Sequence, residues 1–137
     1  MLTDGNGVPI GAAVDGANVH DQKLVRETLE DIPVRRPRPT PRKKQHLCAD
    51  KGYNAESVRR AAKRRRYLAH IPRRGEDPST PKRRHGKARR WVVERTHSWT
   101  NRARRLLIRW EKKARNYLGF MHIQFAITAL RTAGVLG

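Results

Sequence analysis

The segment from His46 to Asn54 predicts a short apolar strand that ends in an aspartate, followed by a glycine turn and the start of a helix. This unit constrains the fold because it places the Asp50 carboxylate at the C-terminal edge of a buried strand, where it can hold a metal ion in open solvent. A second isolated acid, Glu94, stands in a helical segment that is otherwise basic and apolar. Two isolated carboxylates in such a basic chain indicate metal-dependent chemistry on nucleic acid.

The charge of the chain points to the same partner. It contains 32 Lys+Arg against 12 Asp+Glu, a formal net charge of +20, which destabilises a compact state unless a polyanion neutralises it. Nucleic acid is the natural polyanion, and an acidic membrane surface is the weaker alternative because no basic amphipathic helix stands alone as an anchor. The single cysteine, Cys48, excludes an intramolecular disulfide and fits a reducing cytoplasm. No signal peptide or membrane-spanning run is visible in the sequence.

The first third of the chain predicts a hairpin and a helix. Asp4–Gly7 is a tight-turn signal, Val8–Val14 a strand after it, and Met1–Thr3 the end of the other strand. A chain that begins there is expected to begin in the middle of a structural unit. A helix with one apolar face follows, capped by Asp21 and running through Asp31.

The rest of the chain alternates strands, helices and basic loops. We expect an extended basic loop at 33–45, a strand at 46–50, a helix capped by Asn54 through Arg66, a short strand at 67–71 and a Pro/Gly/Arg-rich basic loop at 72–87. A long helix from Lys87 to Lys113 should carry Glu94, and a last apolar helix, 117–132, should pack on it. The C-terminal helical part thus covers 88–133.

Three segments resemble bacterial insertion-sequence transposases of the DDE type. Ala49–Tyr53 is similar to the second-aspartate motif of these proteins, and Gly16–Asp21 matches the segment before their first helix. Their glutamate motif is long and specific. This motif is similar to the segment Trp91–Thr96 of the chain together with Trp99, Asn101, Arg102 and Arg104–Leu106. The resemblance runs from about Asp4 to the C-terminus.

The resemblance implies an α/β, RNase H-like mixed sheet with flanking helices and an Asp-Asp-Glu triad that binds two divalent ions, Mg²⁺ or Mn²⁺. Asp50 and Glu94 would be the second aspartate and the glutamate, and thus both catalytic residues and metal ligands. The first aspartate lies upstream of the hairpin in the family, and neither Asp4 nor Asp15 matches its motif. Residues 1–137 are therefore expected to be a partial catalytic domain that lacks the first, central strand, from a truncated copy, a split gene or a frameshifted element.

Several basic residues are candidates for DNA contact. Arg102, Arg104 and Arg105 follow Glu94 and are expected near the scissile phosphate. Arg90 and Arg95 flank the glutamate. The loop at 33–45 offers further phosphate-binding side chains: Arg35, Arg36, Arg38, Arg42, Lys43 and Lys44.

Each of these assignments has a structural alternative. Asp50 can simply cap a turn, and Glu94 can pair with Arg90 or Arg95. Trp91, Trp99 and Trp110 can stack on bases, but their helical spacing favours core packing. Cys48 is expected to be a small buried hydrophobe.

The function that the resemblance implies is that of an insertion-element transposase, an endonuclease that cuts DNA at the element ends and joins them to target DNA. Such a protein works in the bacterial cytoplasm on the nucleoid, with DNA, a separate N-terminal polypeptide and further copies of itself as expected partners, and without a membrane. The rival interpretation is a non-catalytic basic nucleic-acid-binding protein or transposition inhibitor. Metal-dependent nicking that requires Asp50 and Glu94 separates the two.

Overall fold

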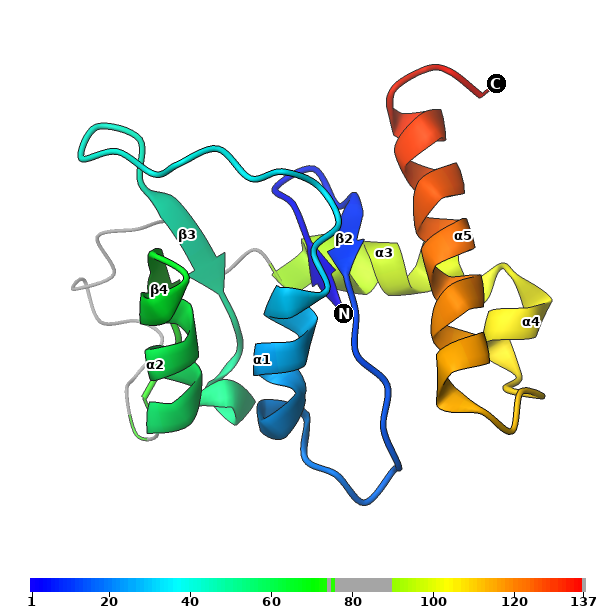
Figure 1. Cartoon of the computed structure of the whole chain (residues 1–137), viewed down its shortest axis with the longest axis horizontal. Helices are drawn as coiled ribbons and strands as arrows, with labels where there is room; N and C mark the ends of the chain where they lie inside the picture. Colours follow the sequence, from blue (N-terminus) through cyan, green and yellow to red (C-terminus); the bar gives the residue numbers. More distant parts are fainter. Residues whose placement is uncertain (74, 76–89, 137) are drawn as a thin grey trace.

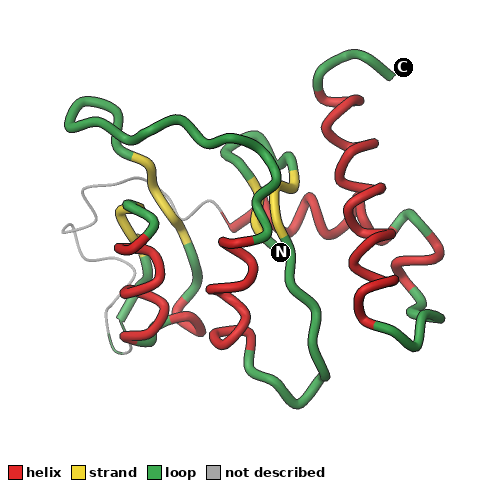
Figure 2. Tube along the Cα trace, in the orientation of Figure 1, coloured by secondary structure: helices red, strands yellow, loops and turns green. Residues whose placement is uncertain are grey.

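The computed structural model describes residues 1–73, 75 and 90–136 of the 137-residue chain, so most of the predicted loop at 72–87 lies outside the described residues. The elements alternate between strand and helix in the first half and are helical in the second (Figures 1 and 2). They are β1 (Leu2–Thr3), β2 (Pro9–Gly11), α1 (Asp21–Glu30), β3 (Gln45–Cys48), η1 (Lys51–Tyr53), α2 (Glu56–Arg64), β4 (Tyr67–His70), α3 (Arg90–Asn101), α4 (Arg104–Leu107) and α5 (Ala114–Thr132). The predicted α/β class is confirmed.

The strands form two separate pairs. β1 and β2 make an antiparallel hairpin, whereas β3 and β4 are parallel and are joined through α2. Among the described residues the predicted single mixed sheet is not observed. Figure 1 shows the hairpin in the middle of the molecule, with β3, β4 and α2 to one side and α5 to the other.

The hairpin turn forms where the sequence predicted it. One carboxylate oxygen of Asp4, Oδ1, accepts hydrogen bonds from the amides of Asn6 at 2.8 Å and Val8 at 2.9 Å. Gly7 adopts a positive φ of 88°, a conformation that glycine tolerates without steric cost. The Asp-Gly-Asn-Gly sequence thus encodes its own turn.

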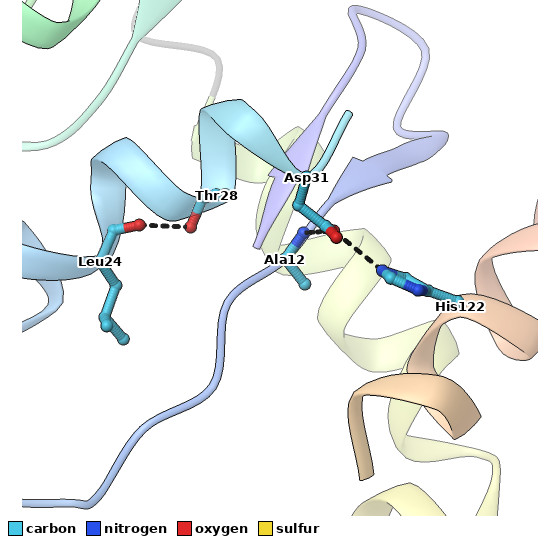
Figure 3. Close-up of polar contacts among 5 residues, drawn as sticks. All are labelled: Ala12, Leu24, Thr28, Asp31 and His122. Carbon is cyan, nitrogen blue, oxygen red and sulfur yellow. Dashed lines mark hydrogen bonds and ion pairs between the residues drawn. The ribbon is translucent and has the colours of Figure 1, made fainter. Parts of the chain in front are cut away.

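Strand β2 is shorter than the predicted strand at 8–14. It ends at Gly11 because the amide of Ala12 leaves the strand ladder and donates to Asp31 Oδ2 at 2.9 Å. The same oxygen lies 2.8 Å from His122 Nε2 on α5 (Figure 3). Asp31 therefore ties the hairpin, the end of α1 and α5 together.

The predicted helix caps are wrong in detail. The residue before α1 is His20, which makes no side-chain cap, and Asp21 is instead the first helical residue, where its charge favours the helix dipole. Helix α2 begins after Ala55 rather than Asn54. The Asn54 side chain accepts from Arg59 Nη2 at 2.9 Å instead, so it fixes the side of the helix rather than its end.

The core lies between β3, α1 and α2. Its centre is Leu29, Leu47 and Ala62, each at most 7% exposed, and Tyr67 packs against this cluster. The alternation along β3 points Leu47 inward and leaves Cys48 exposed on the other face. The prediction that Cys48 is buried was therefore wrong, because the opposite strand face was assigned to the core.

The single helix predicted from Lys87 to Lys113 is broken. Helix α3 ends at Asn101, and Ala103 takes an extended conformation with φ −78° and ψ 103° before α4 begins. The Thr100 hydroxyl donates to the carbonyl of Thr96 at 2.9 Å, a contact that competes with regular helix geometry and often bends helices. The break turns Leu106 into the interior at 6% exposed.

Candidate active site

Asp50 lies at the edge of a hollow between the start of α1 and η1. The cavity has a volume of about 360 Å³ and carries two carboxylates, Asp21 and Asp50. Its full lining is Ala17, Val19, His20, Asp21, Gln22, Asp50, Gly52 and Tyr53. The sequence predicted Asp50 here but gave Asp21 only a capping role.

The local fold around Asp50 orients its carboxylate. Asp50 is the N-cap of η1, and its Oδ1 accepts from the amide of Gly52 at 2.7 Å. A Cβ at position 52 would lie 2.9 Å from that oxygen, so only glycine permits this approach. The side-chain amide of Gln22 donates to the carbonyl of Gly52 and anchors the turn to α1. The structural alternative, Asp50 as a turn cap, is thus realised, and Oδ2 remains without a hydrogen bond to a described group.

The phenol of Tyr53 is affected by the charges of both Asp21 and Asp50. Its hydroxyl lies 3.5 Å from Asp21 Oδ2. Burial raises the pKa of Tyr53 above its ordinary value of 10.0, and the negative charges of Asp21 and then Asp50 raise it further. Asp21 and Asp50 therefore act on one phenol from two different elements.

Glu94 lies exposed on α3, and no ion pair joins it to a side chain that the structure describes. The side chain of Arg90 lies outside the described residues, and Arg95 is engaged elsewhere. The helix itself is held against the hairpin by Thr96, whose hydroxyl lies 2.7 Å from the carbonyl oxygen of Gly7. The carboxylate of Glu94 is thus exposed to solvent on a helix that is fixed against the hairpin.

The α-amino group of Met1, just before β1, is partly buried. The α-amino group of Met1 interacts with the charge of Asp21 on α1, and its own pKa is lowered mainly by burial. It also lowers the pKa of His97, after the larger effect of partial burial of that ring. His97 is one helical turn beyond Glu94, and α3 itself packs against β1.

The guanidinium of Arg95 is held by contacts within the protein. Its guanidinium stacks on the rings of Trp91 and Trp99, with a centroid distance of 4.8 Å to each. It also donates to the carbonyl of Asn6 at 2.6 Å. Whether Arg95 also contacts DNA stays a prediction.

Two of the three tryptophans do not pack as predicted, whereas Trp99 is partly buried. Trp91 is 56% exposed and Trp110 is 75% exposed, so core packing is wrong for both. Trp91 lies over the guanidinium of Arg95, and Trp110 lies in the irregular segment between α4 and α5. Helical spacing alone suggested a continuous buried stripe that the broken helix does not provide.

The other predicted DNA-contact residues divide into two sets. Arg102 and Arg104 are exposed and form no ion pair with a described residue, while Arg105 donates to Glu111 Oε1 at 2.9 Å and stacks on Phe120. That contact lowers the pKa of Glu111. Exposed side chains also follow one another in the loop before β3, at Arg42, Lys43 and Lys44.

A divalent metal fits the donor chemistry of Asp50 and Glu94. Both are exposed carboxylates without an ion pair to any described group, and such hard oxygen ligands suit Mg²⁺ or Mn²⁺. Within residues 1–73, 75 and 90–136, no three His, Cys, Asp or Glu side chains are arranged to hold a metal ion.

Comparison with known proteins adds a family. The sequence matches the family model described as Transposase DDE domain over residues 1–129. It is 38% identical over 130 residues to the putative transposase for insertion sequence element IS402 of Burkholderia cepacia, covering 90% of this chain and 57% of that protein. The chain thus spans little more than half the length of this relative. No solved structure matches the chain significantly.

None of the helices in the described part of the chain is long and apolar enough to cross a membrane.

Proposed function

The chain belongs to the DDE transposase family, and from this membership we propose that it supplies Asp50 and Glu94 to a metal-dependent site that cuts DNA at the ends of an insertion element. The same site would then join the freed ends to target DNA. The chain would act in the bacterial cytoplasm, on the nucleoid. The observation that carries the proposal is that both carboxylates are exposed, without ion pairs to described groups, in a chain with a net charge of +20.

The proposal assigns each residue a task. Bound divalent ions would activate a water or a DNA 3′-hydroxyl and stabilise the leaving oxygen. Asp50 would offer Oδ2 to an ion while Gly52 holds Oδ1, and Glu94 would approach from α3. Arg102 and Arg104, just beyond Glu94 and exposed, would hold phosphates of the DNA backbone.

The third carboxylate is proposed to come from outside these 137 residues. Asp4 is committed to the amides of its own turn, and Asp15 accepts from the amide of Gly16 at 2.7 Å. The proposed source is a strand of the transposase that lies between β1 and β3, on a separate N-terminal polypeptide or on the same protein. A second copy of the chain is the alternative source.

A nicking assay tests the proposed function. The chain is incubated with a labelled element-end duplex and Mg²⁺ or Mn²⁺, alone and together with the polypeptide encoded immediately upstream. We expect cleavage mainly in the mixture, lost on chelation and reduced on the order of a hundredfold by Asp50→Asn or Glu94→Gln. The matched controls Asp15→Asn and Glu27→Gln remove exposed carboxylates elsewhere and should leave cleavage within about twofold, as expected for groups outside the site.

The rival function, a non-catalytic DNA-binding protein or transposition inhibitor, makes a different forecast. It predicts DNA binding that is unchanged in Asp50→Asn and Glu94→Gln, with no metal-dependent cleavage in any mixture. Cleavage that falls equally in all four variants would also contradict the proposed site, because it would reflect loss of general stability or charge.

A further inference from the structure

A second cleft, on the opposite end of α2 from Asp50, is lined by five arginines. It has a volume of about 400 Å³ and is formed by Arg36, Pro37, Arg38, Pro39, Arg64, Arg65 and Arg66. From these contacts we propose that the cleft binds phosphates of duplex DNA at a point away from the cutting site. The inference rests on the proposed function only in taking DNA as the ligand.

The loop side of the cleft is stiffened by its sequence. Proline fixes its own φ and keeps the preceding residue extended, and here Pro37 and Pro39 each follow an arginine. Arg36 and Arg38, both on this segment, line the same cleft. The side chain of Gln45 donates to the carbonyl of Pro37 at 2.9 Å and anchors the loop to the start of β3. Figure 1 shows this loop arching from the end of α1 to β3.

On the helix side of the cleft, a guanidinium covers the negative C-terminal end of α2. The C-terminal end of a helix carries partial negative charge and repels an anion. Here Arg36 donates to the carbonyl of Arg65 beyond the end of α2 and also stacks on the ring of Tyr67, 4.0 Å from its centroid. One guanidinium thus satisfies a carbonyl at the helix end and is held in place by a ring, so that the negative end of the helix is covered on the side of the cleft.

Arg66 occupies a position where glycine is the usual residue. It follows the helix end with a positive φ of 57° and is the sole non-glycine residue with positive φ in the described part of the chain. A side chain in this left-handed conformation is strained, and glycine at such a helix end avoids the strain. The residue at this strained position is nevertheless an exposed arginine that lines the cleft. Backbone strain of this kind is often kept where the side chain has a function.

Little negative charge opposes these arginines. Glu30 lies 3.8 Å from Arg65 Nη2, but it is shared with Arg26, whose Nε is closer at 3.0 Å. No acidic residue lines the cleft itself. A planar guanidinium binds phosphate through two parallel hydrogen bonds, so arginine suits this ligand better than lysine does.

The cleft is separated from Asp50 by the length of α2. The helix has 9 residues and is therefore about 14 Å long at about 1.5 Å per residue. That length corresponds to about four base pairs of duplex at about 3.4 Å each. A duplex that reaches both places would be held by the cleft several base pairs from the cut.

The test measures DNA affinity without divalent ions, so that it does not depend on the metal site. Fluorescence anisotropy follows the binding of the full chain to a labelled duplex of arbitrary sequence over a range of NaCl concentrations. We expect Arg38→Ala combined with Arg66→Gly to reduce the salt slope of log K by about 1.8, at about 0.9 per lost phosphate contact. Arg60→Ala combined with Arg115→Ala removes the same charge from exposed positions outside the cleft and should change the slope by less than half as much.

Stability and charge are controlled separately. Arg66→Gly relieves the left-handed strain and should keep or raise the melting temperature while lowering affinity, whereas Arg66→Lys should retain most of the affinity. The proposal is overturned if the cleft double variant matches the control double variant, or if the unmodified chain binds no duplex. If binding depends on the cleft but no metal-dependent cleavage is found, the proposed function fails and the cleft stands. If metal-dependent cleavage is found but DNA binding does not depend on the cleft, the proposed role of the cleft fails and the proposed function stands.

Discussion

The hydroxyl of Thr96 lies 2.7 Å from the carbonyl oxygen of Gly7, across 89 positions of sequence. It is also within 2.9 Å of the carbonyl of Val92 on its own helix, so one hydroxyl proton is shared between the two acceptors. Thr96 is completely buried. This contact fixes the helix that carries Glu94 to the hairpin turn, and the orientation of the proposed site depends on it.

Replacing Thr96 by valine should therefore destabilise the chain. The substitution keeps the shape of the side chain but leaves the buried carbonyl of Gly7 without a donor, at a cost of about 1–3 kcal/mol. Chemical denaturation followed by circular dichroism gives the free energy of unfolding. Thr132→Val is the control, since among the described residues the Thr132 hydroxyl donates only to the carbonyl of Thr128 on its own helix. An equal loss in both variants would contradict the role of Thr96.

The junction at Asp31 makes a second prediction. Asp31→Ala removes the acceptor for the amide of Ala12, which is 1% exposed, and the partner of His122 (Figure 3). We expect a loss of about 1–3 kcal/mol in unfolding free energy, because the buried amide loses its acceptor. His122→Ala should cost less, because the amide keeps its partner. If His122→Ala were the more damaging change, the His122–Asp31 contact rather than the hydrogen bond from the Ala12 amide would dominate the junction.

Two glycine-to-alanine changes should have opposite effects. At Gly52 the added methyl would lie 2.9 Å from Asp50 Oδ1, so Gly52→Ala should displace the carboxylate and lower both stability and Mn²⁺ affinity. At Gly119, inside α5, nothing lies within 4 Å of the added atom, and alanine should stabilise the helix by about 0.5–1 kcal/mol. Thermal melts with and without Mn²⁺ measure both effects, and unchanged Mn²⁺ binding in Gly52→Ala would argue against this geometry.

The cavity beside Asp50 can be probed through Tyr53. Because the folded pKa of Tyr53 is raised, the unfolded chain releases the proton first as pH rises, so this residue's contribution to stability is present below about pH 10 and lost above it. Ultraviolet titration should show one tyrosine ionising later than the others. Asp21→Asn should lower that pKa more than Asp50→Asn, and no change in either variant would show that the two carboxylates do not face the phenol.

The sequence was sufficient where a structure is encoded by neighbouring residues. The Asp4–Gly7 turn, the strand before Asp50 and the alternation of strands and helices all follow from local patterns. The predicted long helix failed at Ala103, where the backbone becomes extended before α4, because apolar periodicity continues across this position and does not reveal the break. The outward position of Cys48 likewise depends on which face of β3 meets α1 and α2.

The candidate site was predictable in its chemistry and not in its surroundings. Asp50 and Glu94 stood out because they are isolated acids in a basic chain. Asp21 was missed because its approach to the Asp50 cavity comes from the packing of α1 on η1. Arg95 was assigned to DNA because charge is visible in sequence, whereas its stacking between two tryptophans is visible only in the fold.

The central claim, that Asp50 and Glu94 serve one metal site, is tested most directly by paramagnetic broadening with Mn²⁺. Amide signals of the isotopically labelled chain, mixed with the polypeptide proposed to supply the third carboxylate, are followed as Mn²⁺ is added. We expect the signals of Gly52 and Arg95, each next to a proposed ligand, to broaden together at the same low Mn²⁺ concentration, and Asp50→Asn to abolish both effects. Broadening near one residue alone, or at both but independent of Asp50, would contradict it.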